Sequence, residues 1–395
     1  MILFKSLDRY KLAVFLSSLS IFFGIFREFL IVGLLGFTAE NDELQLYLSI
    51  FYSIGLMIDP MRLACLNLYS ELSLPKMLAA ATIISLPFVI VVGCLMSYAT
   101  HHIDWQILWI TLGGSYLNLM AALLITFKQR HNIFLKAQLI NVMPNFVLIP
   151  GIIICYQLAR DQVVLAMVSF TSIIPIIQCV LLLSLSNRDQ QRIQKNSITF
   201  WASLVIFIRH FAAMIGEQLF QVIIRAAFYN YRTGFLSVYA MMIRIYAALR
   251  FILIDSFIGS KLANWDLLKN EPPLATLLKS KSIALGIILI TLTICLHPFH
   301  QLLYSALQMV LILCFGFYFS TLVRILYFKI NRHEINPTII WQFAFYEIVC
   351  ALGAFLLTNH FNYSILSILW LGYVAKPFAQ LLLLRKRFYG LLASS

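Results

Sequence analysis

Residues 77–98 have the sequence MLAAATIISLPFVIVVGCLMSY, which contains no charged side chain. A transmembrane α-helix needs about 20 mostly apolar residues to cross the hydrocarbon core of a bilayer, which is about 30 Å thick. This stretch therefore predicts a membrane-spanning helix. Similar stretches lie at residues 12–36, 45–69, 105–127, 134–157, 162–184, 201–226, 234–258, 282–298, 302–326, 337–358 and 363–384. We expect an all-α polytopic membrane protein with about twelve transmembrane helices.

The composition excludes most other classes of protein. Of 395 residues, 61% are hydrophobic and only 11% are charged, whereas a soluble domain has about 25% charged residues. The seven cysteines all lie in apolar stretches and no CxxC occurs, so they are typical of buried apolar positions and not of a disulfide or metal framework. No P-loop sequence is present either, which argues against direct use of ATP.

The positive charges predict how the chain is oriented. With the N-terminus in the cytoplasm, twenty of the 29 Lys and Arg residues fall in cytoplasmic segments, and only Arg160 and Arg232 fall in outer loops. Such an excess is typical of the cytoplasmic side of a membrane protein. We therefore expect a multi-pass membrane protein with both termini in the cytoplasm.

A short internal match indicates a duplication. Residues 48–51 (LSIF) resemble residues 236–239 (LSVY), and the same offset of 188 residues carries Arg62 onto Arg250. An even number of helices in each half gives a parallel repeat. We expect an N-lobe of helices 1–6 at residues 1–184, a cytoplasmic linker at 185–200 and a C-lobe of helices 7–12 at 201–395.

Charged residues inside the predicted spans are concentrated in the first two helices of each half. Ten of the twelve lie there, namely Arg27, Glu28, Asp59, Arg62, Arg209, Glu217, Arg225, Arg244, Arg250 and Asp255. A charge at the centre of the bilayer costs about 2.5–3.5 kcal/mol even on lenient scales, so such residues normally face a polar cavity. We expect a central cationic cavity between the lobes. Its six arginines against four acids favour an anion, because the guanidinium group binds phosphate and carboxylate oxygens in a bidentate manner.

Individual roles follow from the spacing along each helix. We expect the substrate to contact Arg27, Arg62, Arg244 and Arg250, with Arg209 in reserve. The predicted charge partners are Glu28, Asp59 and Glu217, and a polar stripe of His210, Glu217 and Gln221 is expected to line water. Several residues also have structural interpretations: Arg225 and Asp255 could extend to the interface, and Asp59 could simply pair with Arg62.

Two charged residues lie near the C-terminal end of the chain. Glu347 lies far from the arginines in sequence and is a candidate site for a coupling ion. Lys376 directly precedes Pro377 and could make a local contact at a kink.

The segment from Phe26 to Val32 (FREFLIV), continuing to Gly36 and an acidic loop with Glu40, Asp42 and Glu43, resembles the opening of MviN/MurJ-type lipid II flippases. These belong to the multidrug/oligosaccharidyl-lipid/polysaccharide (MOP) flippase superfamily. The resemblance implies a protein of the bacterial inner membrane. It also implies a cationic central cavity lined by an Arg–acid pair of helix 1, an arginine of helix 2 and an arginine of helix 8. The matching positions are Arg27-Glu28, Arg62 and Arg244, the last in YAMMIR at 239–244; residues 258–262 (IGSKL) are similar to the exit from helix 8.

Two departures from that family bear on the substrate. MurJ-type proteins generally have two further C-terminal helices, and the loop between helices 2 and 3 is short here. Both favour a Wzx-type relative that moves the polyprenyl-linked repeat unit of an exopolysaccharide, capsule or O-antigen in place of lipid II.

We therefore expect a transporter, not an enzyme, that flips a polyprenyl-diphosphate-linked glycan across the membrane by alternating access. Expected partners are that lipid, the bilayer, and a polysaccharide polymerase with its glycosyltransferases, but no nucleic acid. No cofactor or metal is expected, and the coupling ion, Na⁺ or H⁺, is left open. The alternatives are a multidrug/cation antiporter of the same superfamily, a membrane-embedded glycan polymerase or ligase, and a purely structural membrane subunit.

Overall fold

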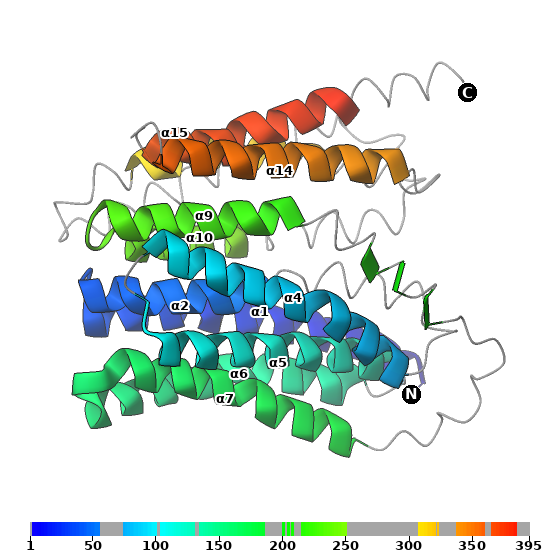
Figure 1. Ribbon diagram of the computed structural model, residues 1–395. Helices are drawn as coiled ribbons and strands as arrows, with labels where there is room; N and C mark the ends of the chain where they lie inside the picture. The colour runs from blue at the N-terminus through cyan, green and yellow to red at the C-terminus, as the bar shows by residue number, and fades with distance from the viewer. Residues whose placement is uncertain are drawn as a thin grey trace, which may run out of the picture.

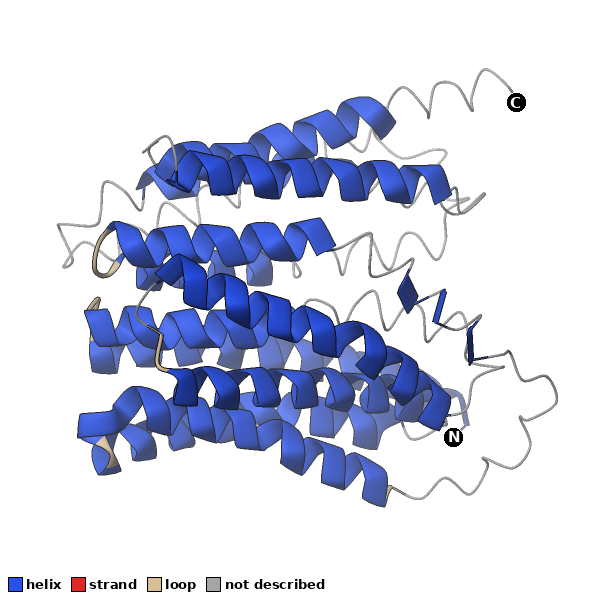
Figure 2. Cartoon of the chain, viewed as in Figure 1, coloured by secondary structure: helices blue, strands red, loops and turns tan. Residues whose placement is uncertain are grey.

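The fold was analysed in a computed structural model. It describes residues 2–55, 74–100, 103–130, 134–185, 200–201, 204–205, 207–208, 215–250, 307–320, 322–323, 337–359 and 365–384. Within these ranges the regular structure is helical and contains no strand (Figure 2). The predicted all-α polytopic fold is confirmed.

The N-terminal helices pack side by side as one group, which occupies the lower part of Figure 1. They are α1 (Ile2–Leu35), α2 (Ala39–Gly55), α4 (Leu74–Thr100), α5 (Trp105–Arg130), α6 (Phe134–Leu158), a 3₁₀ turn at Arg160–Gln162 and α7 (Val163–Ser184). Gly36 has a φ of 68° and allows the sharp turn from α1 into α2. Asp104 begins α5 as an N-cap, because its Oδ1 accepts the N–H of Gln106 at 2.7 Å.

The C-terminal helices form a second group above the first in Figure 1. They are α9 (Ile215–Tyr231), α10 (Phe235–Arg250), a helix at Leu307–Ser320, α14 (Pro337–Asn359) and α15 (Ile365–Trp370). The chain continues from α15 through a π-helical turn, Leu371–Ala375, into a helical segment that reaches residue 384. Gly234 has a φ of 87° and allows the turn between α9 and α10.

Five described segments are long and apolar enough to span a membrane. They are Leu74–Tyr98, Trp105–Lys128, Lys136–Leu158, Arg160–Ser184 and Ile365–Leu384. Ile83, Leu86 and Ile90 of α4 are exposed at helical spacing, as expected for a face that meets lipid. The chain is thus a multi-pass membrane protein.

Eleven of the twelve predicted spans overlap a described helix, and the ninth, residues 282–298, lies outside the described residues. Helix α1 begins ten residues before the predicted span at residue 12. The reason is that charged residues end the apolar stretch but do not interrupt backbone hydrogen bonding. The lobe boundaries stay predictions, since nearly all of the linker also lies outside the described ranges.

The two groups meet along α1, α2 and α4 on one side and α9 and α10 on the other. Helix α1 contacts α10, α2 contacts both α9 and α10, and α4 contacts α9. One cluster of buried apolar residues runs through both groups and includes Ile31, Leu44, Phe228 and Leu236. The contact between the groups therefore includes the four helices in which the sequence concentrates its buried charges, together with α4.

Candidate functional site

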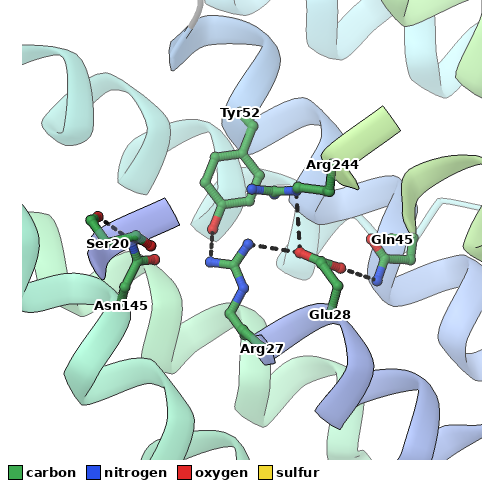
Figure 3. A network of polar contacts seen from close by, with 7 residues as sticks. All are labelled: Ser20, Arg27, Glu28, Gln45, Tyr52, Asn145 and Arg244. Carbon is green, nitrogen blue, oxygen red and sulfur yellow. Dashed lines mark hydrogen bonds and ion pairs between the residues drawn. The ribbon is translucent and has the colours of Figure 1, made fainter. Parts of the chain in front are cut away.

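A buried ion-pair cluster lies where the two groups meet (Figure 3). Arg27 and Glu28 of α1 have only 2% and 1% of their surface exposed. Nη2 of Arg27 donates to Oε1 of Glu28 at 2.7 Å. The same oxygen lies 3.2 Å from Nε of Arg244 on α10. One carboxylate therefore joins two arginines from opposite groups.

Tyr52 of α2 contacts both guanidinium groups. Its hydroxyl accepts a hydrogen bond from Nη1 of Arg27 at 2.5 Å. Its ring lies 4.1 Å from Cζ of Arg244 and 5.2 Å from Cζ of Arg27, measured to the ring centroid. Such cation–π contacts stabilise a guanidinium group, more strongly where water is excluded. The tyrosine thus holds the two arginines near one another.

The cluster has unused hydrogen-bond donors. A guanidinium group has five N–H donors, and within the described residues Arg27 uses two of them while its Nε has no partner. Arg244 meets Glu28 only through Nε, and the described part of the chain offers its Nη groups no hydrogen bond. The Arg244 side chain is 30% exposed. Arg27, Glu28 and Arg244 together carry one net positive charge. The Nη groups of Arg244 can therefore donate hydrogen bonds to an oxyanion.

A polar stripe on α2 positions this cluster. Asp42, Gln45, Ser49 and Tyr52 recur at intervals of three and four residues, which places them on one face of a helix. Nε2 of Gln45 donates to Oε2 of Glu28 at 3.1 Å, so both oxygens of that carboxylate have partners. Gln45 and Tyr52 were not predicted as site residues from the sequence, although this spacing could have indicated them.

Asp42 links the groups at the end of the molecule where α1 turns into α2. Its Oδ1 accepts the backbone N–H of Ser237 at 2.8 Å and the Ser237 hydroxyl at 2.6 Å. Its Oδ2 accepts the N–H of Gly234 at 2.5 Å. The carboxylate therefore caps the N-terminus of α10, where backbone N–H groups and the helix dipole favour a negative charge. This contact closes the two groups on each other at that end.

Arg225 makes another contact between the groups. Its Nη1 donates to the backbone carbonyl oxygen of Ser49 at 2.8 Å, joining α9 to α2. The sequence allowed two interpretations of this arginine, and the structure favours the buried contact over extension to the interface.

Gln221 does not line water as expected. It is 6% exposed, and its Nε2 donates to the Tyr373 hydroxyl at 3.1 Å while its Oε1 accepts from Tyr239 at 3.3 Å. The two tyrosine hydroxyls are 2.8 Å apart. Tyr373 lies in the π-helical turn, a conformation frequent at functional sites. The predicted stripe is wrong at this position because the face of α9 that bears Gln221 packs against other C-terminal helices.

Glu347 and Lys376 form a second buried pair, within the C-terminal helices. Nζ of Lys376 lies 4.0 Å from Oε1 of Glu347, and both residues are buried. From the sequence, no contact between these two residues was predicted. The structure thus places a cation of the protein itself beside the candidate ion-coupling carboxylate.

Other predicted site residues lie beyond what the structure describes. Asp59, Arg62, Arg209 and His210 are outside the described residues, and so is Asp255. Glu217 and Arg250 lie on α9 and α10, but their side chains are not described. Their roles stay predictions. In the described ranges no group of three or more His, Cys, Asp and Glu residues is arranged to hold a metal ion.

The sequence matches no protein-family model and no curated protein sequence. Among solved structures, the chain is similar to the lipid II flippase MurJ in an inward closed conformation, with a TM-score of 0.65 and 16% identity over 96% of this chain and 87% of that chain. It is also similar to an inward-facing multidrug resistance MATE family transporter of the MOP superfamily, with a TM-score of 0.57 and 13% identity over 96% and 91% of the two chains. Both likenesses extend over almost the whole chain. The protein therefore has the fold of the MOP superfamily.

Proposed function

We propose that the protein is a transporter that moves a polyprenyl-diphosphate-linked glycan across a membrane by alternating access. One observation carries the proposal: the net positive cluster joins both helix groups, and in the described part of the chain the Nη donors of Arg244 have no hydrogen-bond partner. The MOP fold supports the transporter class, and the charge of the cluster supports an anionic substrate.

A diphosphate head group cannot cross hydrocarbon by itself, because burying its charge without compensation is prohibitive. Arginine can replace the lost hydration, since its planar fork forms two parallel hydrogen bonds to phosphate oxygens. In the structure, the carboxylate of Glu28 pairs with Arg27 and Arg244, in the way that a phosphate of the head group would. The head group would then compete with Glu28 for Arg244.

This competition links binding to movement of the helix groups. Glu28 lies on α1 and Arg244 on α10, so the ion pair between them is also a contact between the groups. A ligand that replaces Glu28 as the partner of Arg244 removes this contact between α1 and α10. Binding therefore changes the stability of the arrangement in which the two helix groups are in contact, relative to one in which they have separated. The Asp42 cap on α10 holds one end closed, so movement at that end requires this cap to break.

Several aspects of the proposal come from the sequence. With the N-terminus in the cytoplasm of a bacterial cell, the end closed by Asp42 faces away from the cytoplasm across the inner membrane. The short loop between helices 2 and 3 favours a repeat unit of exopolysaccharide, capsule or O-antigen over lipid II. A polymerase and glycosyltransferases would be its functional partners, and Na⁺ or H⁺ a candidate coupling ion.

A multidrug/cation antiporter shares the fold but fits the cluster less well. Cationic drugs would meet two arginines and one carboxylate, a net positive site that repels them. We therefore rank this function second.

The proposal is tested by translocation in proteoliposomes that contain the purified full chain. A polyprenyl-diphosphate glycan labelled on its sugar is incorporated, and a membrane-impermeant enzyme that cleaves the sugar reports how much is outside. Arg244→Gln removes the free guanidinium, and Arg232→Gln serves as control because Arg232 is exposed in the preceding loop. We expect wild type and control to translocate the lipid and Arg244→Gln to lose at least tenfold in rate. Equal rates in all three proteins, or in protein-free liposomes, would overturn the proposal.

A further inference from the structure

A cavity of about 290 Å³ lies inside the N-terminal group, next to the ion-pair cluster. Residues of α1, α2, α5, α6 and α7 line it, including Arg27, which also belongs to the cluster. Pockets for small ligands begin at about 300 Å³. This space, which we call the amide cavity, has room for one compact group.

Prolines in two of its walls alter the hydrogen bonding of the helices. Pro144 has no N–H, so the carbonyl oxygen of Ile140 lacks its helical partner. Nε2 of Gln178 donates to that oxygen at 2.8 Å. Pro175 likewise leaves the carbonyl of Thr171 without a helical donor, and both of these residues line the cavity. A side chain of the cavity therefore satisfies the first carbonyl, and the second, that of Thr171, has no donor from its own helix.

Two amide side chains of the cavity have no hydrogen-bond partner among the described residues. Asn145 donates to the backbone and hydroxyl oxygens of Ser20, at 3.0 and 2.6 Å, and is used for packing between helices. In contrast, Asn118 of α5 and Asn141 of α6 make no side-chain hydrogen bond within the described residues. Each amide has two donor hydrogens and one acceptor oxygen. Both side chains are half-buried, so these donors and acceptors are available to a ligand or to water in the cavity.

The character of the walls narrows the class of ligand. Among the described residues that line the cavity none is Asp or Glu, and Arg27 contributes a positive charge, which disfavours a metal cation. Half of the fourteen lining residues have polar side chains, which disfavours a lipid acyl chain. Paired donors and acceptors beside the aromatic rings of Phe51 and Tyr52 suit a polyhydroxylated ring, which needs both kinds of hydrogen bond around its rim and an apolar face.

We propose that the amide cavity binds one sugar ring of the transported glycan while the ion-pair cluster binds its diphosphate. Arg27 lines the cavity and also bonds to Glu28 of the ion-pair cluster, so the two sites are adjacent. A sugar attached to a diphosphate at the cluster would therefore lie in the cavity. This inference rests on the proposed function and deepens it, because it assigns recognition of the sugar to Asn118 and Asn141.

The test compares two lipids in their binding to the full chain in lipid nanodiscs: polyprenyl diphosphate carrying one N-acetylhexosamine, and the same lipid without sugar. We expect wild type to bind the first about tenfold more tightly, as two amide hydrogen bonds allow. The double variant Asn118→Ala/Asn141→Ala should lose this preference and keep its affinity for the bare lipid. Gln106→Ala of α5 and Gln157→Ala of α6 are matched controls, because both glutamines are exposed on the same helices.

A second variant covers the case that the double variant fails to fold. Ala122 also lines the cavity, and Ala122→Leu fills it without removing a polar group, so this variant should lose the sugar preference too. Equal binding of both lipids by wild type, or a preference retained in every folded cavity variant, would overturn the inference and leave the proposed function standing. Failure of wild type to bind either lipid would overturn both.

Discussion

Removal of the shared carboxylate is the most informative perturbation of the ion-pair cluster. Glu28→Gln keeps the size and one acceptor oxygen of the side chain but removes the charge that Arg27 and Arg244 share. We expect two effects: the protein becomes less stable, and it binds an anionic head group more tightly.

The size of the first effect follows from burial. Arg27 is 2% exposed and would keep only its hydrogen bond to Tyr52 as a full-strength contact. Loss of one partner of a buried ion pair costs about 3–5 kcal/mol, and the hydrogen bond that Gln still accepts returns about 1 kcal/mol. We therefore expect a loss of about 2–4 kcal/mol in the free energy of unfolding. Glu40→Gln on the same helical hairpin is the control, since Glu40 is exposed and should change stability by less than about 0.5 kcal/mol.

The second effect separates a functional role from a purely structural one. Glu28 competes with the head group for Arg244, so its neutralisation should tighten binding of polyprenyl diphosphate by about tenfold, equivalent to about 1.4 kcal/mol. Unfolding in mixed detergent micelles and binding in nanodiscs are measured on the same preparations. The double variant Arg27→Gln/Glu28→Gln should be more stable than the sum of its single variants by about 1–3 kcal/mol. The reasoning is refuted if Glu28→Gln is as stable as Glu40→Gln and binds the lipid no more tightly than wild type.

Three further predictions concern the other contacts. Asp42→Ala removes the cap of α10 and should destabilise the closed arrangement by at least about 2 kcal/mol, seen as a longer distance between probes placed on the ends of α2 and α10; an unchanged distance distribution would count against the cap. Arg225→Gln should cost about 1–2 kcal/mol of stability by removing the charged donor to Ser49, and a melting temperature equal to wild type would contradict that role. Lys376→Met leaves Glu347 buried without its cation, so the variant should be destabilised by about 3 kcal/mol and regain stability when Na⁺ replaces choline; an identical response of wild type and variant to Na⁺ would refute this pairing.

Much of the fold could be predicted because hydrophobic length alone determines a membrane span. The stretch at 77–98 became α4 within three residues at either end. The start of α1 could not be predicted this way, because a helix can continue beyond the bilayer without any apolar requirement.

The candidate site was predictable where two residues are neighbours in sequence, as with Arg27 and Glu28, or where a resemblance indicated a third, Arg244. The role of Gln221 was not predictable. Its face of α9 was identified correctly as polar, but its contacts with Tyr239 and Tyr373 depend on how the C-terminal helices pack. A polar stripe has the same periodicity whether it faces water or a neighbouring hydroxyl group.

The central claim is that the ion-pair cluster binds a diphosphate head group. Electron cryomicroscopy of the full chain in nanodiscs with a polyprenyl-diphosphate glycan tests it most directly. We predict a phosphate oxygen within hydrogen-bonding distance of Arg244 Nη, with Glu28 moved away from Arg244. A head group bound elsewhere, with the Glu28–Arg244 pair intact at its present 3.2 Å, would contradict it.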